Sequence, residues 1–186
     1  SRLLSGVCAT AMVVAMVEYA AQFRVQLSGL RDAPAYTAVA SDAAARKIEP
    51  HALVIPFWPG DSHYTSVYQY FASLHRIRMV NGYRPFVPKS YRVDLFQRIS
   101  PINSGKLSDE ILAELRQMGV RYVILHEDLF PEKVSPRPVG YTLKQLLNHP
   151  HLELVAHEGT IWSWRILDAP RVVTPLGSDW NIWFPN

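Results

Sequence analysis

The sequence predicts an α/β fold: a layered domain with a mixed, partly parallel sheet and a C-terminal antiparallel hairpin, preceded by one transmembrane helix. Three observations predict this fold. An uncharged apolar run stands near the N-terminus, short apolar runs then alternate with helical stripes, and two alternating segments near the C-terminus flank a Glu-Gly-Thr turn. We expect three parts: a transmembrane helix and juxtamembrane segment over 1–30, an α/β domain over 31–169 and a Trp-rich irregular tail over 170–186.

The composition excludes several classes of protein. Hydrophobic residues make up 48% of the 186 residues and charged residues 19%, below the ~25% of an average soluble protein. This much apolar side chain argues against disorder over most of the length. The single cysteine excludes an intramolecular disulfide framework and a Cys-rich zinc site. A formal net charge of +3 is too small and too dispersed to indicate nucleic-acid binding.

The N-terminal segment has the length and border of a membrane span. Residues 3–17 carry no charge, and the apolar stretch continues to 23, close to the ~20 residues that a transmembrane helix needs. Glu18 stands near the end of the stretch, with Tyr19 and Phe23 as interfacial aromatics and Arg24 just outside. Two alternatives remain open: a soluble core helix, and an uncleaved signal sequence with Arg2 as its basic region. The basic residues on the two sides do not fix the orientation.

The first half of the domain shows alternating helix and strand patterns. The elements expected are a helix over 35–48, a strand over 53–57 covered on both faces, a turn over 58–61, a helix with the stripe Val67, Tyr70, Phe71 and Leu74, a strand over 76–80, a proline-paced loop over 83–90 and a helix over 91–99.

The second half has clearer start and stop signals. Ser108 is the expected N-cap of a helix with the apolar face Ile111, Leu112, Leu115 and Met118, and Gly119 is its expected left-handed end. Residues 120–126 read as a central strand. Thr142 is the expected cap of a helix over 143–149, and 152–157 with 161–167 form the expected hairpin.

No motif of known chemistry is present: there is no Gly-rich phosphate loop, nucleophile elbow, HExxH or dinucleotide fingerprint. We therefore predict no catalytic, cofactor-binding or metal-binding residue. His126-Glu127-Asp128 at a strand end is a weak candidate for metal binding or proton transfer, and a solvated turn explains it better. The pair His149 and His151 and the pair Asp61 and His63 are weaker still.

A loop that combines basic, aromatic and proline residues is the best candidate for binding. Such a loop can hold phosphate, lipid headgroups or a protein partner at a low ordering cost, and tryptophans of the tail can add to it. The alternative is that the aromatic side chains pack under the sheet and only a charged rim shows. The predicted binding residues are Arg76, Arg78, Tyr83, Arg84, Phe86, Lys89, Tyr91, Arg92, Trp180 and Trp183.

The order of several short motifs resembles a known family. An apolar helix ends in Glu18-Tyr19, and the strand 53–57, Asn81-Gly82-Tyr83, a Pro-x-x-Pro-x-Tyr loop over 85–91 and the segment 115–128 follow in turn. This order resembles the C-terminal part of bacterial polytopic membrane proteins related to GT-C type polyprenyl-phosphate-dependent glycosyltransferases. In that family, transmembrane helices precede one extracytoplasmic α/β domain. The catalytic carboxylates of the family lie in an early loop that nothing here matches, so no catalytic residue is carried over.

The resemblance implies a domain on the periplasmic side of a bacterial inner membrane. Its implied partners are membrane lipid and other membrane helices or subunits, with no cofactor and no nucleic acid. Two functions remain open. One is a non-catalytic domain of a glycosyltransferase-like protein that contributes to binding of an acceptor, a lipid-linked sugar or a partner, with any glycosyl transfer supplied by an upstream membrane region. The other is a single-anchor accessory subunit of a larger membrane complex without glycosyl transfer activity.

Overall fold

A computed structural model describes residues 6, 8, 10–20, 33–60, 62–82, 87–130 and 134–173. The chain divides into two units, Ser1–Asp32 and Ala33–Asn186. In the first unit the described residues between 6 and 20 are helical. No helix among the described residues combines the length and the apolar character required to cross a membrane. The transmembrane helix over 3–23, part of which lies outside the described residues, therefore stays a prediction.

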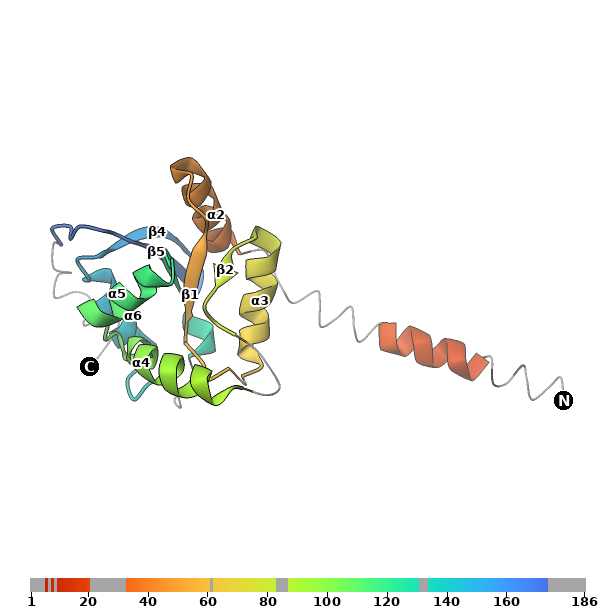
Figure 1. Cartoon of the computed structure of the whole chain (residues 1–186). Helices are drawn as coiled ribbons and strands as arrows, with labels where there is room; N and C mark the ends of the chain where they lie inside the picture. The colour runs from red at the N-terminus through yellow and green to blue at the C-terminus, as the bar shows by residue number, and fades with distance from the viewer. Residues whose placement is uncertain are drawn as a thin grey trace. The chain divides into compact units, whose positions relative to one another are not determined.

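The second unit is built on a five-stranded mixed sheet with the order β2-β1-β3-β5-β4 (Figure 1). The strands β2 (Arg78–Met79), β1 (His51–Ile55) and β3 (Tyr122–His126) are parallel. The strands β5 (Ile161–Ile166) and β4 (Leu152–Glu158) form an antiparallel hairpin that adds to β3. The predicted mixed sheet with a C-terminal hairpin at one edge is confirmed.

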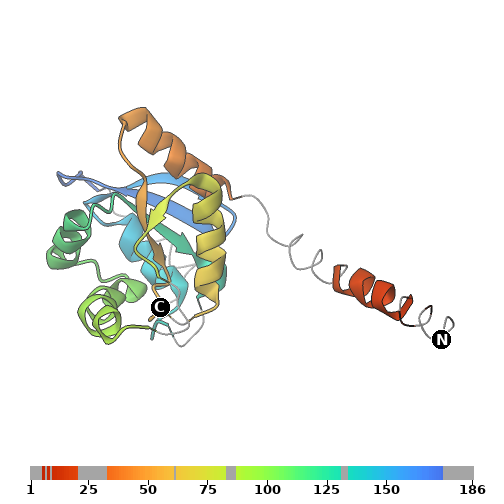
Figure 2. The same cartoon turned by 45° about the vertical axis from the view of Figure 1, so that its right-hand side comes forward.

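Helices cover both faces of the sheet, because the central strands bury both of their faces. The side chains of Ala52, Val54, Tyr122 and Ile124 pack against α2 (Pro34–Arg46) and α3 (Tyr64–His75). The alternate side chains of β1 and β3 face the opposite layer. That layer contains η1 (Tyr91–Phe96), α4 (Gln97–Ile99), η2 (Ser100–Ser104), α5 (Asp109–Gln117) and α6 (Val139–Leu147), and Figure 2 shows the two layers from a second angle.

Local sequence signals fixed several elements as expected. Ser108 accepts a hydrogen bond from the backbone N–H of Ile111 at 3.4 Å and so caps α5. Gly119 has a φ of +77° after the end of that helix, a conformation that favours glycine. All five residues of β3, the central strand, are buried.

Five expectations need correction. The buried side of α3 consists of Thr65, Tyr68, Phe71 and Ala72, so Phe71 of the expected stripe is buried and Val67 partly buried, while Tyr70 and Leu74 are not. Tyr70 and Leu74 are 40% and 55% exposed, because the rings of Tyr68 and Phe71 are the ones that pack on the sheet. The strand expected over 76–80 contains only Arg78–Met79, since Arg76 is the left-handed residue that ends α3.

Two further corrections concern helices, and a third concerns the strand β1. Thr142 lies inside α6 and does not cap it: its hydroxyl donates to the carbonyl of Asn103 at 2.7 Å, and Pro138 stands at the N-cap. The helix expected over 91–99 is a wide π-type turn over Tyr91–Phe96 that continues into the short α4. The last strand residue of β1 is Ile55, so the strand expected over 53–57 begins and ends two residues earlier.

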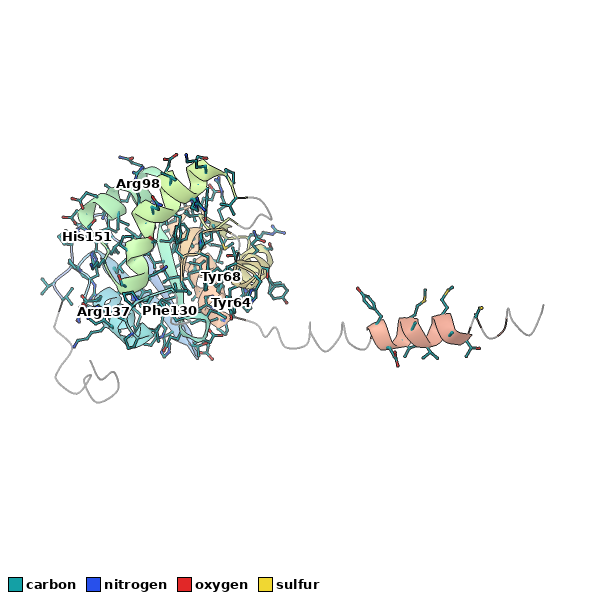
Figure 3. The ribbon with its side chains drawn as sticks, turned by 90° about the horizontal axis from the view of Figure 1, so that it is seen from below. Tyr64, Tyr68, Arg98, Phe130, Arg137 and His151 are labelled. Carbon is teal, nitrogen blue, oxygen red and sulfur yellow. The ribbon has the colours of Figure 1, made fainter. Side chains whose placement is uncertain are left out.

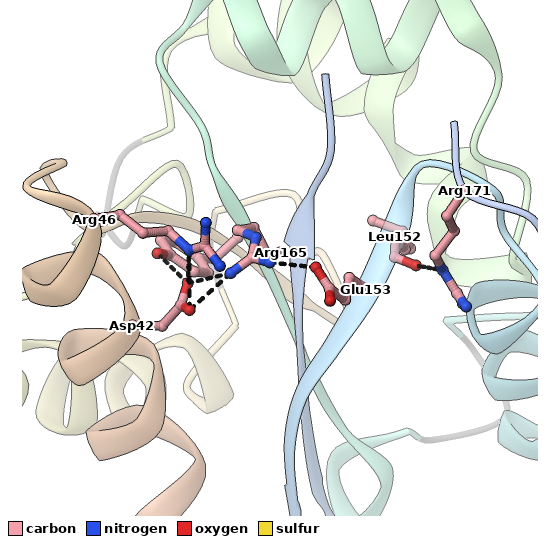
Figure 4. A network of polar contacts seen from close by, with 7 residues as sticks. Asp42, Arg46, Leu152, Glu153, Arg165 and Arg171 are labelled. Atoms are coloured by element: carbon pink, nitrogen blue, oxygen red, sulfur yellow. Dashed lines mark hydrogen bonds and ion pairs between the residues drawn. The ribbon is translucent and has the colours of Figure 1, made fainter. Parts of the chain in front are cut away.

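A polar network ties α2 to the hairpin across one face of the sheet (Figure 4). The Asp42 carboxylate accepts hydrogen bonds from Arg165 Nη1 at 2.7 Å, from the Tyr122 hydroxyl at 2.9 Å and from Arg46 Nε at 3.1 Å. Arg165 also donates to Glu153 of β4. Burial raises the pKa of Asp42, but the hydrogen bonds from Arg165, Tyr122 and Arg46 outweigh it and hold that pKa below its ordinary value.

We predict that Asp42→Ala lowers the free energy of unfolding by about 2 kcal/mol, because it leaves the Arg165 guanidinium without its main partner. The Arg165 side chain is only 13% exposed. The control Arg46→Ala removes an exposed i,i+4 pair with Asp42 and should cost about 0.5 kcal/mol or less. Urea denaturation at neutral pH measures both values, and equal losses in the two variants would contradict the assignment.

Candidate functional site

The carboxyl ends of β1 and β3 form a switch point in the sheet. The connection after β1 leads to α3 on one face, and the connection after β3 leads to α6 on the opposite face. Adjacent loops that part in this way leave a crevice outside the strand ends, which is where open α/β sheets bind ligands. This edge of the sheet is therefore the candidate functional site.

Two asparagine side chains hold the carboxyl end of β1. Asn81 Oδ1 accepts from the backbone N–H of Val54 and Asn81 Nδ2 donates to the Val54 carbonyl, both at 2.8 Å. Asn103 makes the same pair of bonds with Phe57, at 2.7 and 2.8 Å. Both asparagines are buried. Each carboxamide therefore satisfies one backbone donor and one backbone acceptor that the short strand β2 does not reach.

The first pocket at this edge, here called the apolar pocket, has a volume of about 330 Å³. Tyr91 forms part of its wall: the ring lies 6.2 Å from that of Phe57, and the hydroxyl accepts from the backbone N–H of Gly82 at 3.3 Å. Burial raises the pKa of Tyr91, so the hydroxyl stays neutral at physiological pH. The pocket is lined by Gly60, Val80, Gly82, Val87, Pro88, Tyr91 and Leu95.

The second pocket, here called the aromatic pocket, has a volume of about 410 Å³. The indole of Trp58, in its wall, is held in place by two tyrosines of α3. Its Nε1 donates to the Tyr68 hydroxyl at 3.3 Å, and the ring stacks on Tyr64 at 5.4 Å between centroids. Figure 3 shows Tyr64 and Tyr68 at this side of the domain. The pocket is lined by Phe57, Trp58, Pro59, Ser62, Phe96, Ser100, Asn103 and Val134.

His126, at the end of β3, is buried in a cage of aromatic rings. Its Nε2 lies 2.8 Å from the Tyr36 hydroxyl, and the rings of Tyr68 and Phe71 lie 5.0 and 6.1 Å away. Burial lowers the pKa of His126 to about 3. The solvated turn expected for this residue is therefore wrong, because an imidazole that is 1% exposed contacts rings instead of water.

The neighbours of His126 do not complete a metal site. Glu127 accepts a hydrogen bond from the Trp162 indole, and Asp128 Oδ1 lies 3.9 Å from His126 Nδ1. Among the residues that the structure describes, no group of three or more His, Cys, Asp or Glu side chains is placed to hold a metal ion.

The pair His149 and His151 stabilises the fold, and of the pair Asp61 and His63 only His63 is described. His149 Nε2 lies 3.0 Å from the Leu107 carbonyl, and His151 Nδ1 lies 3.1 Å from Arg116 Nη2. His63 is exposed at the start of α3 and contacts Tyr64, at 4.1 Å between ring centroids. Asp61, its expected partner, lies outside the described residues.

The predicted binding residues fall into separate groups. Arg76 and Arg78 are exposed beside α3 and line a hollow with Asn81 along β2, where Arg78 pairs with Glu49 at 3.1 Å. Tyr91 lines the apolar pocket and is half-buried, while Lys89 and Arg92 beside it in the sequence are exposed. The predicted residues that lie outside the described part of the chain are Tyr83, Arg84, Phe86, Trp180 and Trp183.

Sequence reasoning missed the aromatic pocket. The sequence pattern predicts only a turn at Trp58, and no local pattern indicates a role for Asn103 or Phe96, because their partners are far away in the sequence. A usable signal was present: the run Phe57-Trp58-Pro59-Gly60 directly follows a buried parallel strand, the position at which α/β sheets place their sites.

Comparison with known proteins gives one finding. No family model and no curated protein matches the chain. A solved structure that resembles it is the cryo-EM structure of the arabinofuranosyltransferase AftD from mycobacteria, at 15% sequence identity and a TM-score of 0.48. The likeness covers 74% of this chain and 12% of that chain.

The buried state of His126 predicts a pH dependence of stability. The folded pKa lies below the ~6.5 of an unfolded histidine, so between about pH 6.5 and 3 only the unfolded chain binds this proton. The free energy of unfolding should then fall by up to about 1.4 kcal/mol per pH unit as the pH drops through this window.

Two variants isolate this contribution. The double variant Tyr36→Phe/His126→Phe replaces both partners of the buried pair and should lose the one-proton slope. Tyr36→Phe alone should keep the slope, because burial and not the hydroxyl depresses the pKa. Urea denaturation at pH 7, 6 and 5 measures the slopes, and a double variant with the slope of the unmodified chain would contradict the assignment.

Proposed function

We propose that the second unit is a non-catalytic binding domain of a membrane glycosyltransferase-like protein, displayed on the extracytoplasmic side of a bacterial inner membrane. Its role is to contribute to the binding of an acceptor, a lipid-linked sugar or a partner. The observation that carries the proposal is the apolar pocket at the carboxyl ends of β1 and β2, with exposed cationic residues beside it.

The chemistry of the apolar pocket favours binding over catalysis. Its lining, over the described part of the chain, supplies aliphatic side chains, two glycines and one neutral hydroxyl, and none of these side chains is a carboxylate, imidazole or amine. Its volume of about 330 Å³ falls within the ~300–1,000 Å³ of small-ligand sites. A hydrocarbon chain matches such a lining, because burial of apolar surface is what the pocket offers.

The exposed residues beside this pocket match a phosphate. Lys89 follows the lining residue Pro88, and Arg92 follows the lining residue Tyr91. Lysine binds phosphate as a point charge, and arginine can bind it through two parallel hydrogen bonds. A ligand with an apolar chain and a phosphate, such as a polyprenyl phosphate, would satisfy both the pocket and its border.

The described residues that carry the family resemblance stabilise the fold. Asn81 of Asn-Gly-Tyr holds the backbone of Val54, and Gly119 provides the left-handed end of α5. Tyr122, in the segment after Gly119, donates a hydrogen bond from its hydroxyl to the Asp42 carboxylate. These roles are what a non-catalytic domain would keep, which supports the proposal.

Membrane attachment and sidedness have a direct test. The chain expressed from residue 1 in bacteria, with alkaline phosphatase fused after 173, should stay in the membrane after a carbonate wash and show phosphatase activity, because the enzyme folds only outside the cytoplasm. Release into buffer would contradict membrane attachment. An attached but inactive fusion would contradict the extracytoplasmic side.

Ligand binding is tested with geranyl phosphate, a short polyprenyl phosphate, added to the full chain in detergent. We expect shifts of the Gly60, Gly82 and Tyr91 amide signals in NMR spectra, and weaker shifts with geraniol or inorganic phosphate alone, since each provides half of the ligand. Tyr91→Ala should weaken binding at least tenfold. Lys89→Ala/Arg92→Ala should weaken it severalfold and reduce its salt dependence.

A matched control is Tyr141→Ala, which removes a half-buried tyrosine of α6 whose ring is covered by the Arg137 guanidinium and which does not line the apolar pocket. It should leave geranyl phosphate binding unchanged. If geranyl phosphate shifts none of the pocket signals in the unmodified chain, the lipid-phosphate function fails, and the single-anchor accessory subunit becomes the better account.

A further inference from the structure

We infer that the aromatic pocket is a subsite for a neutral sugar ring, which stacks on Trp58 and exchanges hydrogen bonds with Ser62 and Ser100. The inference deepens the proposed function and rests on it for the origin of the sugar, either the head of a lipid-linked donor or a glycan acceptor. It concerns residues other than those of the apolar pocket, so the two can be tested separately.

Trp58 has the properties of a prepared stacking platform. Tyr64 stacks on the indole at 5.4 Å with 23° between the planes, and Tyr64 does not line the aromatic pocket, whereas Trp58 does. The hydrogen bond from Nε1 to the Tyr68 hydroxyl fixes the rotation of the ring. Tyr68 is itself buried and donates to the Pro56 carbonyl at 3.2 Å. The indole is therefore positioned before any ligand arrives, which lowers the entropy cost of stacking.

The two serines offer one donor and one acceptor. Ser62 Oγ accepts from the backbone N–H of Tyr64 at 3.3 Å, so its own hydrogen is available to a ligand. Ser100 Oγ donates to the Gln97 carbonyl at 3.4 Å, so its lone pairs remain available. A sugar hydroxyl both donates and accepts, and this pair of serines complements it in both directions.

The uncharged character of the described lining of the aromatic pocket indicates which class of ligand it can bind. Among the residues that the structure describes, none that lines the aromatic pocket carries a charge, and the Asn103 carboxamide is already engaged on both sides by Phe57. A phosphate or carboxylate would enter without a counter-charge, at a high desolvation cost. A neutral ring with an apolar face and polar edges suits a lining of aromatic rings and hydroxyls, and the volume of about 410 Å³ lies within the ~300–1,000 Å³ of ligand sites.

The two pockets meet at one aromatic wall. The Phe57 ring lies 6.2 Å from Tyr91, which lines the apolar pocket, and 5.6 Å from Phe96, which lines the aromatic pocket. A lipid-linked sugar has its hydrocarbon chain and its sugar joined through phosphate, and adjacent pockets of these two characters correspond to its two ends.

The test uses the full chain in detergent, with the NMR signal of the Trp58 indole N–H as the readout. The signal is identified by its loss in Trp58→Phe. Methyl glycosides of several pentoses and hexoses are titrated in one arm, and the sugar that binds is titrated as its geranyl phosphate conjugate in a second arm. We expect a saturable shift of the Trp58 signal with at least one methyl glycoside. Tighter binding of the conjugate would indicate a lipid-linked donor, and equal binding a glycan acceptor.

Three variants test whether sugar binding depends on Trp58 and Ser100. Trp58→Ala should weaken sugar binding at least tenfold, and Ser100→Ala should weaken it severalfold while leaving the aromatic wall in place. The control Trp162→Phe alters a different half-buried indole, which stacks on His157 at 3.5 Å in the hairpin, and should leave binding unchanged. If Trp58→Ala fails to fold, Ser100→Ala and the Trp58 signal of the unmodified chain still decide the question.

The possible failures are distinguishable. If no methyl glycoside shifts the Trp58 signal, or if Trp162→Phe abolishes binding while Ser100→Ala does not affect it, the sugar subsite is overturned. If sugars bind while geranyl phosphate leaves the apolar pocket unchanged, the subsite stands and the lipid-phosphate part of the proposed function fails.

Discussion

The backbone of β1 continues past its neighbour β2, and two asparagine carboxamides take the place of the missing strand. Arg78 and Val80 donate backbone hydrogen bonds to Pro50 and Ala52, which completes the ladder only at the start of β1. Beyond that point the N–H and carbonyl groups of Val54 and Phe57 are paired with the side chains of Asn81 and Asn103. Each buried backbone group left without a partner would cost about 1–3 kcal/mol, so these two side chains determine whether the strand end can stay where it is.

The candidate site depends on this arrangement. Asn81 precedes Gly82, which lines the apolar pocket, and Asn103 itself lines the aromatic pocket. The carbonyl of Asn103 accepts from Thr142, which ties the strand end to α6. Gly105 permits this close packing, because a Cβ at its φ of +74° would lie 2.6 Å from Cβ of Gln145. The carboxamides of Asn81 and Asn103 are used to hold the backbone at the end of β1. The pockets are therefore lined mainly by aromatic rings, aliphatic side chains and hydroxyls.

How far the sequence predicted this structure depended on whether the signals were local. The Ser108 cap, the Gly119 left-handed residue, the buried strand β3 and the hairpin were predictable because each signal lies within a few residues of its effect. On α3 the burial of Phe71 was predicted but that of Tyr68 was not, since the cage of Tyr36, Tyr68 and Phe71 around His126 brings together three distant segments. Asn103 bonds to Phe57 across 46 residues, and Thr142 bonds to Asn103 across 39, so no local pattern could indicate their roles.

For the candidate site, the sequence identified Tyr91 and its cationic neighbours but not the pockets on either side of Phe57.

The most direct test of this account is the amide hydrogen exchange of Phe57 in the full chain. In Asn103→Ala the Phe57 amide loses its acceptor, so its exchange should accelerate about tenfold to a hundredfold, while Ile124 in the centre of β3 keeps its protection. Thr142→Val removes the hydroxyl that donates to Asn103 but leaves both carboxamide bonds to Phe57, and should leave Phe57 protected. A Phe57 amide that exchanges at the same rate in Asn103→Ala as in the unmodified chain would contradict the claim that this carboxamide holds the end of β1.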